Sequence, residues 1–165
     1  SYSDNIKVKC IRPATVCGWS PRMRLDVSVN MLTMQALKNQ VVTVFGGNQT
    51  RPNIHILDMA RVYKHFIDNP QIPDGCYNAG FENISIIDIA EMITNEIPAE
   101  IVVTESNDPR SYRQNSDKLL QTGFIKKYSI IDAVKELRKK YELGKLVDQD
   151  HYYTVKWMKH LGLDS

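Results

Sequence analysis

Arginines that follow turns are the residues of this sequence best suited to binding an anion. Arg51 comes after the turn GGNQT, and at the edge of a strand its guanidinium would donate two parallel hydrogen bonds to phosphate oxygens. Arg22 and Arg24 lie in the loop before a predicted helix and offer the same chemistry. A guanidinium that only faces solvent is the alternative for each of them. The arginines taken alone leave both interpretations open.

Groups suited to the base and the ribose of a nucleotide lie in two other places. The loop NDPRSYRQN, residues 107–115, holds Asp108, Arg110 and Tyr112. A carboxylate accepts hydrogen bonds from hydroxyls, an arginine donates to phosphate, and a tyrosine offers a phenol and a ring. Phe45 ends the apolar run VVTVF, and its ring is able to stack on a flat base. A simple Asp-Pro turn and a core phenylalanine are the alternative interpretations.

Two tyrosine–lysine pairs have the spacing of a phenolate base. On a helix, the ammonium of Lys145 or Lys156 would lie beside the phenol of Tyr141 or Tyr152 and lower its pKa. Gly144 interrupts the first pair, and Tyr152 is more simply explained as a packing residue. Short motifs such as this one also arise by chance. We therefore predict no catalytic residue in this chain.

Motifs for metal, nucleophile and dinucleotide chemistry are missing from the sequence. The four histidines have neither H-x-x-x-H nor H-E-x-x-H spacing, the three cysteines form no C-x-x-C pair, and G-x-S-x-G does not occur. Gly46 and Gly47 are the only glycine pair, and the strand before them leads into a loop instead of a helix. We expect no metal site and no dinucleotide held by this chain alone. His55, between two isoleucines, is expected to pack in a strand.

Strands and helices alternate in the predicted order of elements, which indicates an α/β class. Short apolar or alternating runs predict strands over 6–11, 41–45, 76–80 and 100–105. Periodic apolar faces predict helices over 27–39, 58–68, 86–96, 129–143 and 148–160.

Polar residues at the predicted helix starts provide the expected caps. Asp26 and Asp58 are expected to cap the helices that follow them, and Ser116 a brief helix that Gly123 ends. Ser85-Ile-Ile-Asp88 and Ser129-Ile-Ile-Asp132 have the spacing of capping boxes.

The bulk composition narrows the class of protein. A chain of 165 residues with 42% hydrophobic and 24% charged residues suits one globular domain. A formal net charge of +2 gives no reason to expect nucleic acid or membrane as a partner. Cysteines without a disulfide framework and the lack of a signal pattern favour the cytoplasm. The abrupt start in polar sequence suggests a chain cut from a longer one.

Four strings in order resemble consecutive motifs of one protein family. They are IRPATVCGWSPRMRLDVSVN, VTVFGGNQTRPNIHILDMARVY, CYNAG and NDPRSYRQNSDKLLQTGF. Together they resemble the extended short-chain dehydrogenase/reductases, and more closely the NAD-dependent nucleotide-sugar epimerases and dehydratases. The resemblance implies that residues 1–165 are a C-terminal fragment. It would hold the last strands of a Rossmann sheet, near 6–11 and 76–79, and a small mixed α/β substrate-binding domain.

The resemblance also implies roles for residues that would bind the nucleotide. It places Arg51 at the diphosphate of the sugar nucleotide. Thr43 and Phe45 would line the base, and Asp108 and Tyr112 would lie near the ribose and the rest of the nucleotide.

Further positions follow from the same resemblance. Thr15 would face the sugar or a phosphate, and Asn30 would meet the diphosphate at a helix start. Pro13 and Ala14 would lie beside the nicotinamide of NAD, in the parent enzyme and not in this chain alone.

One departure concerns the phosphate contacts. Glu105 stands where some epimerases have a phosphate-binding arginine, so Arg110 is expected to substitute for it. The parent enzyme would pass hydride from the sugar to NAD+ and back, with its phenolate base in the half that precedes Ser1. We expect a nucleotide-diphosphate sugar as ligand, a homo-oligomer, and no turnover by this chain alone. A non-catalytic nucleotide-sugar-binding module and an oligomerisation module are the alternatives.

Overall fold

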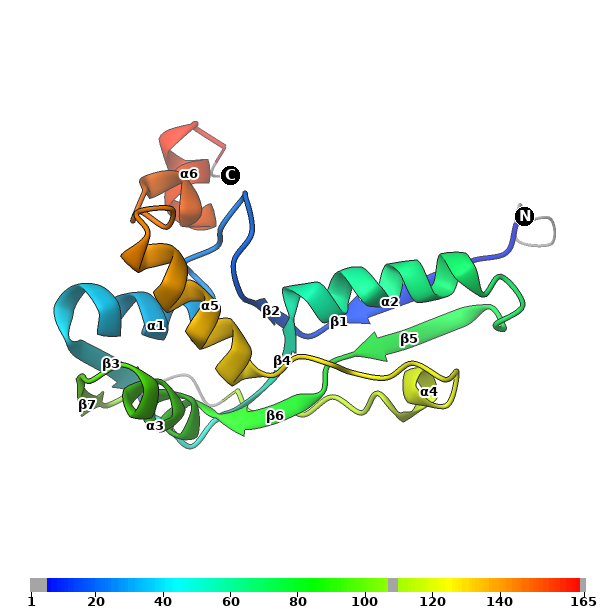
Figure 1. Ribbon diagram of the computed structural model, residues 1–165, viewed down its shortest axis with the longest axis horizontal. Coiled ribbons are helices and arrows are strands. Elements are labelled where there is room, and N and C mark those ends of the chain that lie inside the picture. Colours follow the sequence, from blue (N-terminus) through cyan, green and yellow to red (C-terminus); the bar gives the residue numbers. More distant parts are fainter. Residues whose placement is uncertain (1–5, 107–109, 164–165) are drawn as a thin grey trace.

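The computed structural model describes residues 6–106 and 110–163, which form an α/β fold (Figure 1). Its strands are β1 (Lys9–Pro13), β2 (Thr15–Cys17), β3 (Val41–Phe45), β4 (Thr50–His55), β5 (Gly75–Ala79), β6 (Glu82–Ser85) and β7 (Glu100–Thr104). Its helices are α1 (Ser28–Asn39), α2 (Ile56–Asp68), α3 (Ile86–Glu96), α4 (Asp117–Leu120), α5 (Ile130–Glu142), the 3₁₀ turn η2 (Asp150–Tyr152) and α6 (Thr154–His160). The predicted α/β class is confirmed.

The strands of the described residues pair in three small sheets. β1 and β5 are parallel, with Pro13 opposite Ala79. β2 runs parallel to β4, which pairs antiparallel with β6, and β3 runs parallel to β7. The strands predicted near 6–11 and 76–79 are therefore neighbours, although β1 begins later than expected, at Lys9. The carboxyl ends of β1 and β5 meet at the same edge.

Two hydrophobic clusters build the two ends of the elongated molecule (Figure 1). At one end α1 and α3 pack against β3, and α5 packs against α1 and α3. At the other end α2 covers the pair β1 and β5, with Val62 and Tyr77 buried between them. A third cluster, which includes Met23, Leu25 and Leu146, joins the loop before α1 to the C-terminal segment. Among the described residues, no helix has the length and hydropathy needed to cross a membrane.

Serine side chains cap α3 and α5 as the sequence predicts. Ser85 Oγ accepts a hydrogen bond from the main-chain N–H of Asp88 (3.1 Å). Ser129 and Asp132 form both halves of a capping box. These caps hold because each donor and its acceptor lie within one helical turn of each other.

The predicted aspartate caps are wrong. The N-cap of α1 is Val27, and the carboxylate of Asp26 is occupied by Arg24 and by the main-chain N–H of Thr154. The N-cap of α2 is His55, whose Nδ1 accepts from the main-chain N–H of Leu57 (3.1 Å). At α1 no side chain takes the capping role, and at α2 His55 takes it in place of Asp58.

Other predictions made from the local sequence also differ from the structure, because tertiary contacts decide them. Ser116 does not cap α4 with its side chain, because its Oγ accepts from Gly80 N (3.0 Å) and donates to Gly80 O (2.7 Å). The last predicted helix is broken at Tyr153 into η2 and α6. The sequence also gave no signal that we assigned to β2 or β6. Both are short strands whose hydrogen bonds depend on β4.

Candidate functional site

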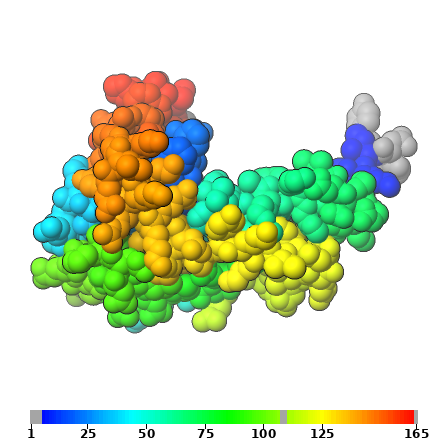
Figure 2. All heavy atoms as spheres, viewed as in Figure 1, coloured from blue at the N-terminus to red at the C-terminus, as the bar shows by residue number. Residues whose placement is uncertain are grey.

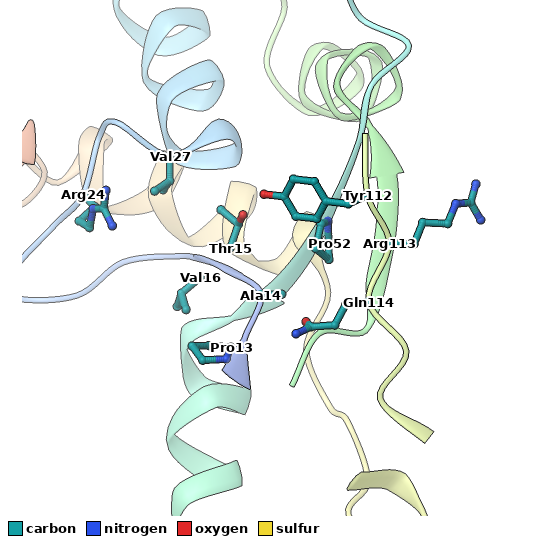
Figure 3. Close-up of a pocket in the computed structure, with 10 residues that line it drawn as sticks. All are labelled: Pro13, Ala14, Thr15, Val16, Arg24, Val27, Pro52, Tyr112, Arg113 and Gln114. Atoms are coloured by element: carbon teal, nitrogen blue, oxygen red, sulfur yellow. The ribbon is translucent and has the colours of Figure 1, made fainter. Parts of the chain in front are cut away.

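A cavity of about 600 Å³ opens beyond the carboxyl end of β1 (Figure 3). Its walls come from the β1–β2 link, the start of α1 and the segment after residue 110. The lining residues are Pro13, Ala14, Thr15, Val16, Arg24, Val27, Pro52, Tyr112, Arg113 and Gln114. Figure 3 shows the phenol of Tyr112 pointing toward Thr15 and Val27, while Gln114 points toward Ala14 and Arg113 points away. Ligands of open α/β sheets bind at such strand ends.

Hydrogen bonds to β4 and β6 fix the segment that carries Tyr112. The main-chain N–H of Tyr112 donates to Thr50 O (3.3 Å), and Thr50 N donates to Ser111 Oγ (3.0 Å). Asn83 exchanges two hydrogen bonds with the main chain of Gln114, at 2.8 and 3.1 Å. The wall of the cavity is therefore attached to the sheet, which favours a preformed site.

Arg51 lies against this same segment. Its Nη1 donates to Arg110 O and to Thr50 O (3.1 Å). Its guanidinium carbon lies 5.2 Å from the centre of the Tyr112 ring, within the range of a cation–π contact. Arg51 does not line the cavity itself. These contacts hold Arg110 and Tyr112 in place.

Arg24 is the cation that faces the cavity from the opposite wall (Figure 3). Its Nε and Nη2 donate to the two carboxylate oxygens of Asp26, at 3.0 and 3.2 Å. Burial raises the pKa of Asp26, but the hydrogen bonds from Arg24 and from the main-chain N–H of Thr154 outweigh it and lower the pKa below its ordinary value. Asp26 is thus a charged partner that fixes one edge of the Arg24 guanidinium.

Predicted site residues divide between this cavity and other parts of the fold. Thr15, Pro13 and Ala14 line the cavity, as does Tyr112. Arg110 is exposed and accepts from Arg51 through its main-chain oxygen.

Three further predicted residues lie outside the cavity lining. Asn30 is buried, and its amide accepts from Gly18 N (2.9 Å) and donates to Arg24 O (2.9 Å). Thr43 and Phe45 lie on β3, opposite residues of β7, and Phe45 is 54% exposed. Asp108 lies outside the described residues.

Sequence reasoning did not single out Val27, Pro52 or Gln114 as site residues. Val27 and Pro52 carry no chemical signal, because their role comes only from the position of their elements. Gln114 lies in the loop that the sequence did identify, and its Nε2 donates to Arg12 O (3.0 Å). The sequence could have indicated Gln114 as a site residue, because a polar side chain two residues from Tyr112 lies on the same face of an extended segment.

His55 is buried and packs as the sequence predicts. Its ring stacks on Tyr128, with centroids 5.0 Å apart, and Nε2 lies 3.6 Å from Glu136 Oε2. Burial lowers the pKa of His55, although Glu136 acts in the opposite direction. Within the described ranges, no group of three or more histidine, cysteine or acidic side chains is placed to hold a metal ion.

Comparison with known proteins finds a family match for the first part of the chain. Residues 1–80 match the NAD dependent epimerase/dehydratase family. That part of the chain contains the β1–β2 link, Arg24, α1 and β4, which supply most of the cavity lining. The matched part therefore builds most of the candidate site, whereas Tyr112, Arg113 and Gln114 lie outside it.

Solved structures with the same fold span several activities. UDP-glucuronic acid 4-epimerase from Bacillus cereus, in complex with UDP-glucuronic acid and NAD, matches with a TM-score of 0.70 and 24% identity over 86% of this chain and 48% of that chain. dTDP-glucose 4,6-dehydratase from Bacillus anthracis, in complex with NAD, matches with a TM-score of 0.71 and 17% identity over 94% and 49%. Monomeric L-threonine 3-dehydrogenase from a metagenome database matches with a TM-score of 0.74 and 14% identity over 88% and 51%.

These likenesses establish a shared fold. The chain spans about half the length of each of these solved structures. Because the threonine dehydrogenase shares the fold, the fold alone does not select a nucleotide sugar as the substrate.

Proposed function

We propose that this chain is the nucleotide-sugar-binding part of an NAD-dependent epimerase or dehydratase. The observation that carries the proposal is the cavity at the carboxyl end of β1, walled by Arg24 on one side and Tyr112 on the other. The match of residues 1–80 to the epimerase/dehydratase family supports it. So does the fold shared with an epimerase in complex with a nucleotide sugar. On this proposal the chain is the C-terminal part of a longer, cytoplasmic enzyme.

The ligand groups are assigned by chemistry. A guanidinium suits the negative oxygens of a diphosphate, so Arg24 is proposed to contact that part of the ligand directly. Thr15 and Tyr112 offer hydroxyls to the sugar or ribose. Arg51 is proposed to act by holding Tyr112, in addition to the diphosphate contact that the sequence resemblance implies.

The remaining assignments rest on the resemblance. They are the diphosphate contacts of Asn30 and Arg110, the base contacts of Thr43 and Phe45, and the ribose contact of Asp108. For Asn30, the amide is already engaged by main-chain groups of residues 18 and 24, so a contact with the ligand would require a further hydrogen bond.

The chain offers groups for the nicotinamide of NAD but no motif for its pyrophosphate. Pro13 and Ala14 form one apolar wall at the carboxyl end of β1, which suits the face of a nicotinamide ring. The sequence has no G-x-G-x-x-G turn for the pyrophosphate. We propose that the polypeptide that holds NAD precedes this chain in the parent enzyme. When bound, NAD would supply the hydride acceptor, while the residues of this chain bind and orient the sugar.

Ligand titration tests the proposal. We expect the 165-residue chain to bind UDP-glucose, UDP-glucuronic acid or dTDP-glucose saturably in calorimetry, without turnover when NAD is added. Arg24→Ala is expected to weaken binding about tenfold or more, because a charge-assisted hydrogen bond is lost. Arg138→Ala, which removes an exposed guanidinium on α5, is the matched control and should leave the affinity unchanged. Lack of binding to every sugar nucleotide, or equal losses in the two variants, would contradict the proposed site.

An oligomerisation role is the second candidate, because an apolar groove lies beside β1. Among the described residues β1 pairs only with β5. The groove has a volume of about 300 Å³ and is lined by Lys7, Lys9, Ile11, Tyr63, Phe66 and Ile67. Ile67 is 77% exposed there. An open strand edge next to exposed apolar side chains favours pairing with a second copy of the chain.

Light scattering at several protein concentrations tests self-association through this groove. We expect the apparent mass to rise with concentration, and Ile67→Asp to suppress the rise by placing a charge in the interface. Lys64→Asp, on the same helix but with its ammonium paired to Asp68, is the control. A constant monomer mass would contradict this role.

A further inference from the structure

The C-terminal segment of the chain lies against the loop that carries Arg24. Figure 1 shows α6 beside the loop before α1, and Figure 2 shows the two regions in contact at the surface. The main-chain N–H of Leu25 donates to Tyr152 O (2.9 Å), and the main-chain N–H of Thr154 donates to Asp26 Oδ2 (3.0 Å). Two consecutive residues of the loop are thus hydrogen bonded to residues 152–154.

Apolar packing strengthens this contact. Met23 and Leu25 are buried in one cluster with Leu146, and Tyr152 and Tyr153 pack on the same cluster. Burial of these apolar side chains away from water stabilises the contact. The loop is therefore held on the C-terminal segment by burial as well as by hydrogen bonds.

The other end of the loop is fixed to α5 and α1. Trp19 N donates to Glu136 Oε2 (3.3 Å), and Lys140 Nζ lies 4.0 Å from the centre of the Trp19 ring. Asn30 bridges Gly18 N and Arg24 O. Since the backbone is held on both sides of Arg24, the direction of its side chain depends mainly on Asp26.

Asp26 leaves one part of the Arg24 guanidinium available. Nε and Nη2 of Arg24 face the carboxylate, whereas Nη1 makes no hydrogen bond to the described residues. The carboxylate in turn is held by Thr154 N, which is the first residue of α6 and so has no acceptor within its own helix. A chain of contacts runs from α6 through Asp26 to a cation at the cavity.

We propose that Asp26 and the main-chain N–H of Thr154 are positioning groups that aim Arg24 at the negatively charged oxygens of the bound ligand. Residues 150–160 would then affect ligand binding through Asp26 and Arg24, although they do not line the cavity. The inference rests on the proposed function, because it requires an anionic ligand in the cavity at β1. The oxygens belong either to the diphosphate or to a carboxylate on the sugar.

Thr154→Pro isolates the contact, because it removes the donor N–H and little else. Proline is well tolerated at the first position of a helix, and the backbone of Tyr153 before it is extended (φ −108°, ψ 97°), outside the α region that a following proline disfavours. Thr154→Ala keeps the N–H and is the matched control. We expect Thr154→Pro to bind UDP-glucuronic acid, which carries both a diphosphate and a carboxylate, about three- to tenfold more weakly than Thr154→Ala, which should bind like the unmodified chain.

Ligands that differ in charge identify the group that Arg24 meets. A loss for both UDP-glucose and UDP-glucuronic acid, with weak uridine binding unchanged, assigns Arg24 to the diphosphate. A loss for UDP-glucuronic acid alone assigns it to the sugar carboxylate. A merely structural role for Thr154 would weaken uridine binding by the same factor, and that result would overturn the inference.

The remaining outcomes separate the two proposals. If the unmodified chain binds none of these ligands, both the proposed function and this inference fail. If it binds them and the two Thr154 variants bind equally well, only this inference fails. Should Thr154→Pro not fold, Asp26→Asn provides the second measurement. It keeps an acceptor for Thr154 N but loses the charged pair with Arg24, and an affinity equal to that of the unmodified chain would again overturn the inference.

Discussion

Replacement of Asp58 by alanine is expected to lower the free energy of unfolding by about 3–5 kcal/mol, because it removes one partner of a buried charged network. Asp58 has no exposed surface. Its carboxylate accepts from the main-chain N–H groups of Lys127 (2.9 Å) and Tyr128 (3.0 Å) and pairs with Arg61. Alanine would leave two N–H donors without an acceptor. Urea denaturation followed by circular dichroism measures the loss.

Two variants control for this prediction. Asp58→Asn keeps one acceptor oxygen in the same place and should be less destabilising than alanine. Asp68→Ala lies on the same helix and breaks only an exposed pair with Lys64, which should cost about 0–1 kcal/mol. If Asp58→Ala were no more destabilising than Asp68→Ala, the buried network would not contribute as its geometry implies.

Substitution of Gly80 by alanine is expected to lower both the stability of the chain and its affinity for a sugar nucleotide. A Cβ at this position would lie 2.3 Å from Gln114 Oε1 and 2.5 Å from Ala14 Cβ. Both neighbours line the candidate cavity. The main chain of Gly80 is fixed by two hydrogen bonds to Ser116 Oγ, so it is not free to move away. Overpacking of this kind costs about 1–3 kcal/mol.

Thermal melting and ligand titration measure the two effects of Gly80→Ala. We expect the affinity for UDP-glucose to fall about tenfold, since the clash displaces walls that orient the ligand. The double variant Gly80→Ala, Gln114→Ala removes one clashing group and should recover part of the stability, whereas the Ala14 contact remains. If the melting temperature and the affinity of the single variant were unchanged, the close approach of Gly80 to Gln114 and Ala14 would not be required for stability or binding.

The two substitutions, Asp58→Ala and Gly80→Ala, test different parts of the fold. Asp58 joins α2 to residues 127–128, which lead into α5, and so holds the two ends of the molecule together. Gly80 lets the segment around Gln114 approach the end of β1 closely enough to close the cavity. Loss of the first should affect folding broadly, and loss of the second should affect the site more than the remainder of the fold.

The sequence by itself determined the features that depend on neighbours within about one helical turn. Apolar periodicity located α1, α3 and α5, and the spacing Ser129 to Asp132 predicted a capping box that the structure contains. These interactions are set by residue types three or four positions apart. The resemblance of ordered motifs assigned Arg51 and Tyr112 to one ligand, and in the structure the two side chains are in contact.

Only the tertiary structure decided which polar groups serve the cavity. Asp26 and Asp58 have the local pattern of helix caps, yet their carboxylates accept from main-chain N–H groups 128 and 69 residues away. Local propensity contains no information about such partners, and a buried carboxylate is held by the donors that packing brings to it. The same reason explains why Arg24, in a loop, faces the cavity, whereas Arg51, on β4, contacts the cavity wall, although both side chains offer the same chemistry.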